Sequence, residues 1–136
     1  MVFTRFLKEA ERLTMSIPGC VIVSGDTPKK ERERILEMFK VGEIPVVANV
    51  GVLTTGFDYP ELDTVVMARP TMSLAMYYQI VGRCIRPHKD KEAAWFVDLC
   101  GNINRFGEVS DLHLKDTGNG KWAVFSRGRQ LTNVRF

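Results

Sequence analysis

The chain has 136 residues, a length that suits one compact domain and excludes two of ordinary size. Hydrophobic residues make up 45% and charged residues 26%, which excludes a disordered or fibrous protein, and its apolar runs are too short to span a membrane. Nineteen Lys and Arg residues against sixteen Asp and Glu residues give a small net charge of +3, whose position is more informative than its size.

Short apolar or β-branched runs alternate with amphipathic stretches over the first hundred residues, a pattern typical of a parallel sheet covered by helices. The expected strands are residues 1–3, 20–23, 44–50, 64–68 and 94–99. The expected helices are residues 6–16, 27–42 and 73–85. The run at 20–23 has no polar alternation, which predicts a strand buried on both faces, and Trp95 and Phe96 are expected to pack in the core or against the sheet.

The pattern changes after Leu99. A turn sequence at 116–120 separates two short strand-like runs, which predicts a β-hairpin. We therefore divide the chain into an α/β domain at 1–100 and a C-terminal extension at 101–136. The net positive charge lies in the last sixteen residues, which contain four basic residues and no acidic one: Lys121, Arg127, Arg129 and Arg135. Such a tail fits an anionic partner, and it equally fits a solvated surface.

The cellular location follows from the cysteines and from the start of the chain. Cys20, Cys84 and Cys100 are odd in number and far apart, so they fit neither a disulfide framework nor a zinc site and suit a reducing cytoplasm. No basic-then-apolar leader precedes the first charged residues, so we expect no export. Because the first expected strand begins at Met1 without lead-in residues, we also expect the chain to be part of a longer protein.

The most informative stretch lies in the third expected helix and just after it. Gln79, Arg83 and Arg86 have the spacing i, i+4 and i+7, which places them on one helix face. Two guanidinium groups on one face repel each other unless an anion lies between them, and arginine suits bidentate contact with phosphoryl oxygens. The other reading is that both arginines only stabilise a helix C-terminus.

Three loops that follow expected strands also carry polar groups: Thr4-Arg5, Ser24-Gly25-Asp26 and the stretch from Val50 to Pro60. The carboxyl ends of parallel strands share one edge of the sheet, where such folds bind ligands, so we expect that edge to collect all these groups and the arginine helix. Taken singly, each loop also reads as an ordinary connection, with a capped helix start or a turn that needs glycine.

These features together resemble the C-terminal RecA-like domain of superfamily 2 helicases and translocases. Residues 1–5 (MVFTR) resemble motif IV, and the stretch from Ser24-Gly25-Asp26 to Arg32 resembles motif IVa. Residues 53–58 (LTTGFD) resemble motif V, and Gln79-x-x-Gly-Arg-x-x-Arg86 resembles motif VI. The amino-acid sequence of motif V, together with NINRFG at 102–107 after the last strand, is most similar to DEAD/DEAH-type DNA helicases of bacteriophages and prophages.

The resemblance implies a fold, a reaction and a role for each matching residue. The fold is an α/β, P-loop NTPase-type parallel sheet flanked by helices. The cofactors are ATP and Mg²⁺, both held mainly by an N-terminal RecA-like domain, the expected partner of this one. The implied catalytic arginines are Arg83 and Arg86, with Arg86 as the main finger. The residues implied on the ATP side are Gly56, Asp58 and Gln79. The implied contacts to a nucleic-acid backbone, without sequence readout, are Thr4, Arg5, Gly25 and Thr54.

Two departures refine these implications. The Thr-Asp pair that opens motif V in many DEAD-box RNA helicases is Val50-Gly51 here, which favours DNA over RNA. The sequence contains no Gly-x-x-x-x-Gly-Lys-Ser/Thr loop and no acidic magnesium motif, so we expect this chain to be inactive as an ATPase by itself. The alternative is a stand-alone nucleic-acid-binding module without catalysis. A Rossmann-type methyltransferase is disfavoured, because no glycine-rich turn follows the first strand.

Overall fold

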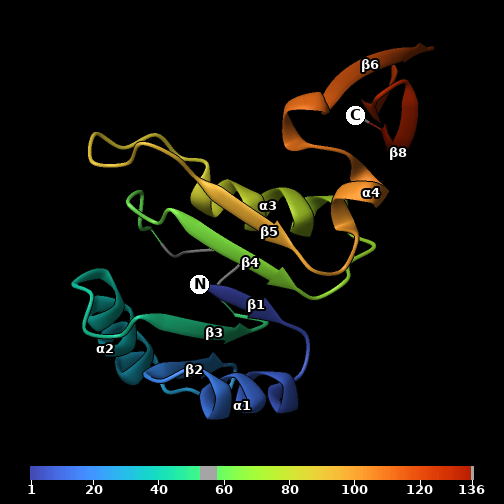
Figure 1. Cartoon of the computed structure of the whole chain (residues 1–136). Helices are drawn as coiled ribbons and strands as arrows, with labels where there is room; N and C mark the ends of the chain where they lie inside the picture. The colour runs from blue at the N-terminus through green and yellow to red at the C-terminus, as the bar shows by residue number, and fades with distance from the viewer. Residues whose placement is uncertain (53–57, 136) are drawn as a thin grey trace.

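The computed structural model describes residues 1–52 and 58–135, of which 133–135 are described by their backbone alone. Five short strands form a parallel sheet in the order β2-β3-β1-β4-β5 (Figure 1). The strands are β1 (Val2–Thr4), β2 (Cys20–Ser24), β3 (Val46–Val50), β4 (Thr64–Ala68) and β5 (Trp95–Asp98). All four neighbouring pairs run parallel. The predicted parallel sheet flanked by helices is therefore confirmed.

Three helices cover the two faces of this sheet: α1 (Leu7–Ser16), α2 (Lys29–Lys40) and α3 (Leu74–Cys84). The chain crosses the sheet in one direction from β1 to β2 and in the other from β2 to β3 and from β4 to β5. Right-handed crossovers then place α1 on one face and both α2 and α3 on the other. Phe3 accordingly packs in the core with Phe39 of α2 and Ile80 of α3, while Ala10 of α1 is fully buried against β2 and β3.

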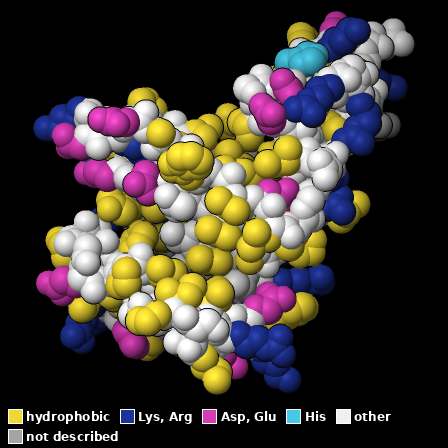
Figure 2. Space-filling view, in the orientation of Figure 1, with side chains coloured by type: hydrophobic (Ala, Val, Ile, Leu, Met, Phe, Trp, Pro, Cys, Tyr) yellow, Lys and Arg dark blue, Asp and Glu magenta, His cyan; other side chains and the backbone are white. Residues whose placement is uncertain are grey.

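On the α1 face of the sheet, none of the described helices covers β4 and β5. Val97 of β5 pairs in register with Val66 of β4, which pairs with Val2 of β1, so all three side chains share that face. Trp95 is 66% exposed, and hydrophobic atoms spread across the middle of this side of the molecule (Figure 2). The expectation for Trp95 was wrong because β5 is an edge strand that α1 does not reach. Phe96 faces α3 instead, with its ring centroid 5.9 Å from that of Tyr77.

The strand predicted to be buried on both faces is the other edge of the sheet. Of the residues in β2, only Val23 is buried, and Val21 and Ile22 are half-buried. An apolar run with no polar alternation indicates helices on both faces of a strand, and β2 does have α1 and α2 on its two sides. Such a run does not show whether the strand has a neighbouring strand on both sides. Among the described strands, β2 has only β3 beside it.

A short helix and a second sheet follow β5. These elements are α4 (Asn102–Phe106), the 3₁₀ helix η1 (Val109–Asp111), β6 (His113–Gly118), β7 (Lys121–Ser126) and β8 (Arg129–Arg135). The antiparallel sheet has the order β6-β7-β8 and stands beyond α4 (Figure 1). The predicted hairpin is present as β6 and β7, and β8 extends it by one strand. Among the described residues, no helix has the length and apolarity needed to cross a membrane.

Two tight turns shape the second sheet. Asn119 and Gly120 connect β6 to β7 with φ values of 54° and 69°, and Arg127 and Gly128 connect β7 to β8 with 49° and 78°. Positive φ at both central residues is the geometry of the two-residue turn that matches strand twist. Asn-Gly is the usual sequence for it, whereas Arg-Gly is not. This difference explains why the first turn was predicted and the second was missed.

Tyr77 joins α3 to the segment after β5. Its ring is stacked on Phe106 of α4 with centroids 5.1 Å apart, and its hydroxyl donates a 2.8 Å hydrogen bond to the carbonyl of Gly107. Burial, reinforced by the charges of Asp98 and Glu108, raises the pKa of Tyr77 to about 12. This raised pKa makes the stability of the fold depend on pH in the alkaline range.

We expect the free energy of unfolding to fall as the pH rises from about 10 towards 12. In that range Tyr77 of the unfolded chain ionises near the ordinary tyrosine pKa of about 10, while Tyr77 of the folded chain keeps its proton. Below pH 10 both states hold the proton and this contribution is fully present. Urea unfolding at pH 9 to 11.5 should show a smaller loss for Tyr77→Phe than for the parent. Equal losses in the two proteins would show that Tyr77 does not carry the effect.

Candidate nucleotide and nucleic-acid interfaces

The carboxyl ends of the central strands meet at one edge of the sheet. Ser24, Val50, Thr4 and Ala68 lie in one row across β2, β3, β1 and β4. The next residues along the chain, among them Gly25, Arg5 and Arg69, therefore share that edge. Two further sequence candidates, Thr54 and Gly56, lie outside the described residues.

The candidates at this carboxyl edge differ in what they offer to a ligand. Thr4 is 1% exposed, and its hydroxyl donates a 3.4 Å hydrogen bond to the carbonyl of Asn49, so its side chain holds β1 to β3. Arg5 is exposed, with its guanidinium carbon 4.9 Å from the centroid of the Phe6 ring. At Gly25, no described atom beyond its two chain neighbours lies within 4 Å of the position of an added Cβ, so this side of its backbone is open to a ligand.

The loop that carries Gly25 is fixed from both sides. The Thr27 hydroxyl accepts a 2.9 Å hydrogen bond from the amide of Ser24, and Nη2 of Arg32 donates a 3.2 Å bond to the carbonyl of Thr27. Thr27 was expected as the N-cap and Pro28 as the first helical residue, but helix α2 begins one residue later, at Lys29, because the Thr27 side chain closes this turn rather than capping the helix. Gly25 is therefore presented by a rigid loop.

The arginines of the motif VI stretch lie at the other end of the sheet. A helix after a parallel strand runs back along the sheet, so α3 carries Arg83 away from the carboxyl edge. The bonds of Lys91 show that the end of α3 lies near the start of β4. Its Nζ donates 2.8 Å hydrogen bonds to the carbonyls of Cys84 and Pro60, and a 3.1 Å hydrogen bond to the carbonyl of Leu62, which lies just before β4. The expectation that one edge collects all the polar groups was therefore wrong for these arginines. Eleven residues of α3, about 16 Å at the usual helical rise, separate the two regions.

Arg86 and Asp58 form an ion pair in this second region. Nη1 of Arg86 lies 2.5 Å from Oδ1 of Asp58, and the Arg86 side chain remains 46% exposed. Helix α3 ends at Cys84, one residue before the expected end, and Arg86 precedes Pro87, so Arg86 lies just after the helix as expected. A guanidinium group that is half exposed and oriented by a carboxylate can turn towards an anion that approaches from outside.

Arg83 is held more deeply than Arg86. It is 9% exposed, and burial, together with the nearby charge of Arg86, lowers its pKa against the opposing effect of Asp58. Gln79, one turn earlier on α3, is exposed. The three residues of motif VI thus differ in access, and within this chain Arg86 is the more accessible of the two arginines.

Asn102 is a buried structural residue to which the sequence analysis gave no role. It is fully buried at the start of α4, and its Oδ1 accepts a 3.0 Å hydrogen bond from the amide of Thr71. Its Nδ2 donates to the carbonyl of Arg69 at 3.0 Å and to Oδ1 of Asp98 at 2.9 Å. These bonds fasten the loop after β4 to the end of β5. An asparagine that follows an Asp-x-x-Gly turn after a strand was the available signal.

We expect Asn102→Ala to destabilise the fold by about 2–3 kcal/mol, because it leaves buried partners on two loops without hydrogen bonds. Asn104→Ala is the matched control, since Asn104 lies on the exposed side of the same short helix and should change stability by less than about 0.5 kcal/mol. Urea unfolding of the two variants measures the difference. Equal effects would mean that the Asn102 bonds add nothing.

Magnesium has no evident site in the described part of the chain, where no group of three or more His, Cys, Asp or Glu residues could hold a metal ion. The donor set around Arg86 fits phosphate oxygens instead, because guanidinium groups donate to anions and cannot ligate a cation.

The fold and these two regions define a class of protein. The chain has the RecA-like fold of helicase C-terminal domains: it superposes on the C-terminal domain of the DEAD-box protein Dbp5 with a TM-score of 0.59 and 23% identity, covering 73% of this chain and 59% of that one. A structure of Saccharomyces cerevisiae Dbp5 L327V bound to RNA and ADP BeF3 has a TM-score of 0.59 and 27% identity, over 76% of this chain and 29% of that chain.

The family follows from the sequence comparison. The family model described as "Helicase conserved C-terminal domain" matches residues 1–88, so the chain belongs to that family. It is 38% identical over 79 residues to a putative ATP-dependent helicase, IRC3, of Saccharomyces cerevisiae, covering 58% of this chain and 12% of that protein. It is 34% identical to a 51.5 kDa protein of a Lactococcus phage, over 75% of this chain and 23% of that protein.

A third relative is the DNA 3'-5' translocase XPB2 of Sulfurisphaera tokodaii, with 36% identity over 68% of this chain and 21% of that protein. The chain thus spans less than a quarter of the length of each of these relatives.

Proposed function

We propose that this chain is the C-terminal lobe of an ATP-dependent helicase or translocase that moves along DNA. The observation that carries the proposal is the Arg86–Asp58 pair, which holds a half-exposed guanidinium group near the amino ends of the strands, away from the carboxyl edge. A motor of this class needs one region that senses ATP and another that grips nucleic acid. The separation of Arg86 from Arg5 and Gly25 supports the presence of one region for ATP and another for nucleic acid.

The proposed chemistry of the first region is charge stabilisation. ATP and Mg²⁺ are held mainly by an N-terminal RecA-like lobe, which supplies the metal and the phosphate loop. Arg86 reaches across the gap between the lobes and neutralises negative charge that develops on the transferred phosphoryl group. Arg83 assists from behind it. Asp58 orients the Arg86 guanidinium group before the lobes close, and exposed Gln79 lies at the contact between them. Gly56 completes the ATP side in this proposal.

The proposed nucleic-acid contact is a grip on the sugar-phosphate backbone. Arg5 donates to phosphate oxygens, the open backbone of Gly25 approaches the strand, and Thr54 adds a hydroxyl. Thr4 acts by positioning Arg5, since its own hydroxyl is bonded to Asn49. Contacts of this kind fix the register of the strand without reading its sequence.

DNA is the proposed strand, and the cytoplasm the proposed location. The choice of DNA rests on Val50-Gly51, which stands where many DEAD-box RNA helicases have a Thr-Asp pair, and on similarity to a protein named as a DNA translocase. The choice of the cytoplasm rests on the three cysteines, which are all free thiols.

The proposal is tested by ATP turnover. The purified chain, with or without single-stranded DNA, should hydrolyse ATP at the background rate. Addition of an N-terminal lobe that carries a phosphate loop should produce turnover that DNA stimulates. Turnover by the chain alone would contradict the division between lobes. DNA binding without any turnover in the mixture would favour the simpler nucleic-acid-binding module.

The choice of DNA is tested separately by fluorescence anisotropy with DNA and RNA oligonucleotides of the same sequence. We expect binding to DNA at least as tight as to RNA. Tighter binding to RNA would overturn the choice of strand and leave the motor intact.

A further inference from the structure

Three arginines line one cavity at the carboxyl edge of the parallel sheet. Arg5 follows β1, Arg69 follows β4, and Arg105 lies on α4 after β5, so three neighbouring strands each contribute one. The cavity measures about 260 Å³, several times the roughly 30 Å³ that one water molecule occupies in the liquid. Pro70, Thr71 and Met72 complete its lining.

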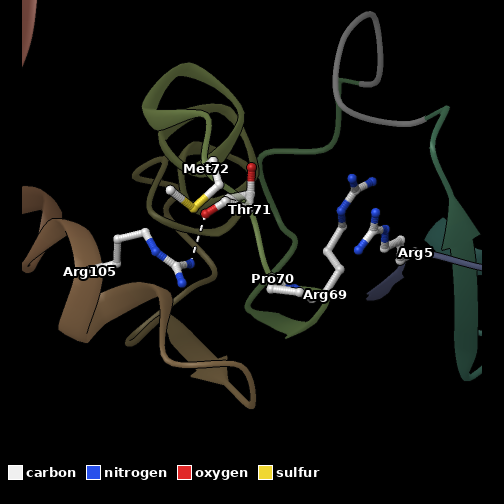
Figure 3. Close-up of a pocket in the computed structure, with 6 residues that line it drawn as sticks. All are labelled: Arg5, Arg69, Pro70, Thr71, Met72 and Arg105. Carbon is white, nitrogen blue, oxygen red and sulfur yellow. Dashed lines mark hydrogen bonds between the residues drawn. The ribbon is translucent and has the colours of Figure 1, made fainter.

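The arginine side chains lie on two sides of this cavity. Figure 3 shows those of Arg5 and Arg69 next to each other, while Arg105 approaches Thr71 from α4. Nη1 of Arg105 donates a 2.9 Å hydrogen bond to the carbonyl of Thr71, which fixes one side of its guanidinium group. Among the described residues, the remaining N–H groups of Arg105 have no other hydrogen-bond acceptor, which leaves them to a ligand in this proposal.

The three arginines of this cavity form no ion pair within the described residues. No carboxylate is among the described residues that line the cavity. Nε of Arg69 is buried and has no hydrogen-bond partner in the described part of the chain. Like charges placed together repel, and a buried N–H without an acceptor costs free energy, so the arrangement favours an anion between the groups.

The backbone around the cavity is fixed in advance. Asn102 bonds to the carbonyl of Arg69 and to the amide of Thr71, so it holds the loop that carries one arginine against the helix that carries another. A site whose groups are already in place loses less entropy when it binds.

We propose that Arg5, Arg69 and Arg105 form a subsite for one backbone phosphate of the bound nucleic-acid strand. The subsite rests on the proposed function for its ligand and extends the grip beyond Gly25 and Arg5, across β4 to α4. Arg69 lies outside the stretches that resemble helicases, and Arg105 lies in the NINRFG stretch, to which the resemblance gave no role. Guanidinium forks match the oxygens of a phosphodiester, and a strand that crosses the carboxyl edge passes over this cavity.

The test is binding of the 136-residue chain to a single-stranded DNA oligonucleotide over a range of salt concentrations. Arg69→Gln and Arg105→Gln should each weaken binding about fivefold at roughly 0.1 M salt and reduce the salt slope by less than about 0.7, the contribution of one phosphate contact to a single strand, because two arginines still face the same phosphate. Arg12→Gln is the control: Arg12 is an exposed arginine on α1, and its variant should bind like the parent. Circular dichroism establishes that all variants are folded.

Three outcomes overturn the subsite. Unchanged affinity and salt slope in both folded variants would show that the arginines do not contact the strand. An equal loss in Arg12→Gln would show only a diffuse effect of charge. Saturable binding of inorganic phosphate to the parent, lost in Arg69→Gln while DNA binding is kept, would assign the cavity to a small free anion.

The subsite and the motor can fail separately. ATP turnover that never appears on mixing the two lobes would contradict the motor and leave arginine-dependent DNA binding in place. Normal turnover with DNA binding that ignores Arg69 and Arg105 would contradict the subsite alone.

Discussion

Arg86→Ala should lower kcat for ATP hydrolysis by the assembled two-lobe protein by about 10³–10⁵, the usual effect of an arginine finger. The guanidinium group acts on charge that appears only in the transition state, so KM for ATP should change far less than kcat. DNA affinity should stay near that of the parent, because Arg86 lies near the amino ends of the strands and the proposed grip at their carboxyl ends.

Two further variants sharpen this result. Lys89→Ala removes an exposed positive charge three residues further on and should leave kcat unchanged. Arg86→Lys keeps the charge but loses the planar fork, so it should restore only part of the rate. A kcat for Arg86→Ala within a few fold of the parent would mean that Arg86 is no finger, and that its pair with Asp58 serves only the fold.

Tyr77→Ala should destabilise the chain by about 3–5 kcal/mol, the range for removing a buried aromatic side chain. Tyr77 is 1% exposed, lies between Phe96 and Phe106, and bonds to the carbonyl of Gly107. Its loss opens a cavity where α3, β5 and α4 meet. Because α4 carries Arg105, the same change should also disturb the arginine cavity.

The neighbouring tyrosine provides the control. Tyr78 is 55% exposed on the same helix, and Tyr78→Ala should cost less than about 1 kcal/mol. Tyr77→Phe keeps the ring and should cost about 1 kcal/mol, the usual net worth of one hydrogen bond. Urea unfolding measures all three. Similar values for Tyr77→Ala and Tyr78→Ala would contradict the place given to Tyr77 in the core.

The parallel sheet was predictable because its strands are short apolar runs between amphipathic helices. Which strands form the edges of the sheet was not predictable. Periodicity reports whether helices cover a strand, but it cannot tell an edge strand from a central one, and so Trp95 was expected to pack in the core or against the sheet. Strand β8 was missed because Arg129–Arg135 is polar and follows an Arg-Gly turn, whose positive φ at Arg127 the sequence does not announce.

The candidate site was predictable where a motif names the residue and unpredictable where the fold assembles it. Arg86 and Asp58 are 28 positions apart, and each was singled out, but only the structure pairs them. Arg69 belongs to none of the stretches that resemble helicases, and Arg105 belongs to NINRFG, to which no role was given. They became candidates because Asn102 brings the loop after β4 against α4, a long-range contact that no local pattern encodes.

The central claim is that Arg86 leaves the neighbourhood of its own lobe to meet a nucleotide held by another. A crystal structure of the two-lobe protein with DNA, ADP and beryllium fluoride tests this most directly. The account predicts that a guanidinium nitrogen of Arg86 lies about 2.7–2.9 Å from the fluoride group that stands for the γ-phosphate. A closed structure in which Arg86 remains turned to Asp58, out of reach of that group, would contradict it.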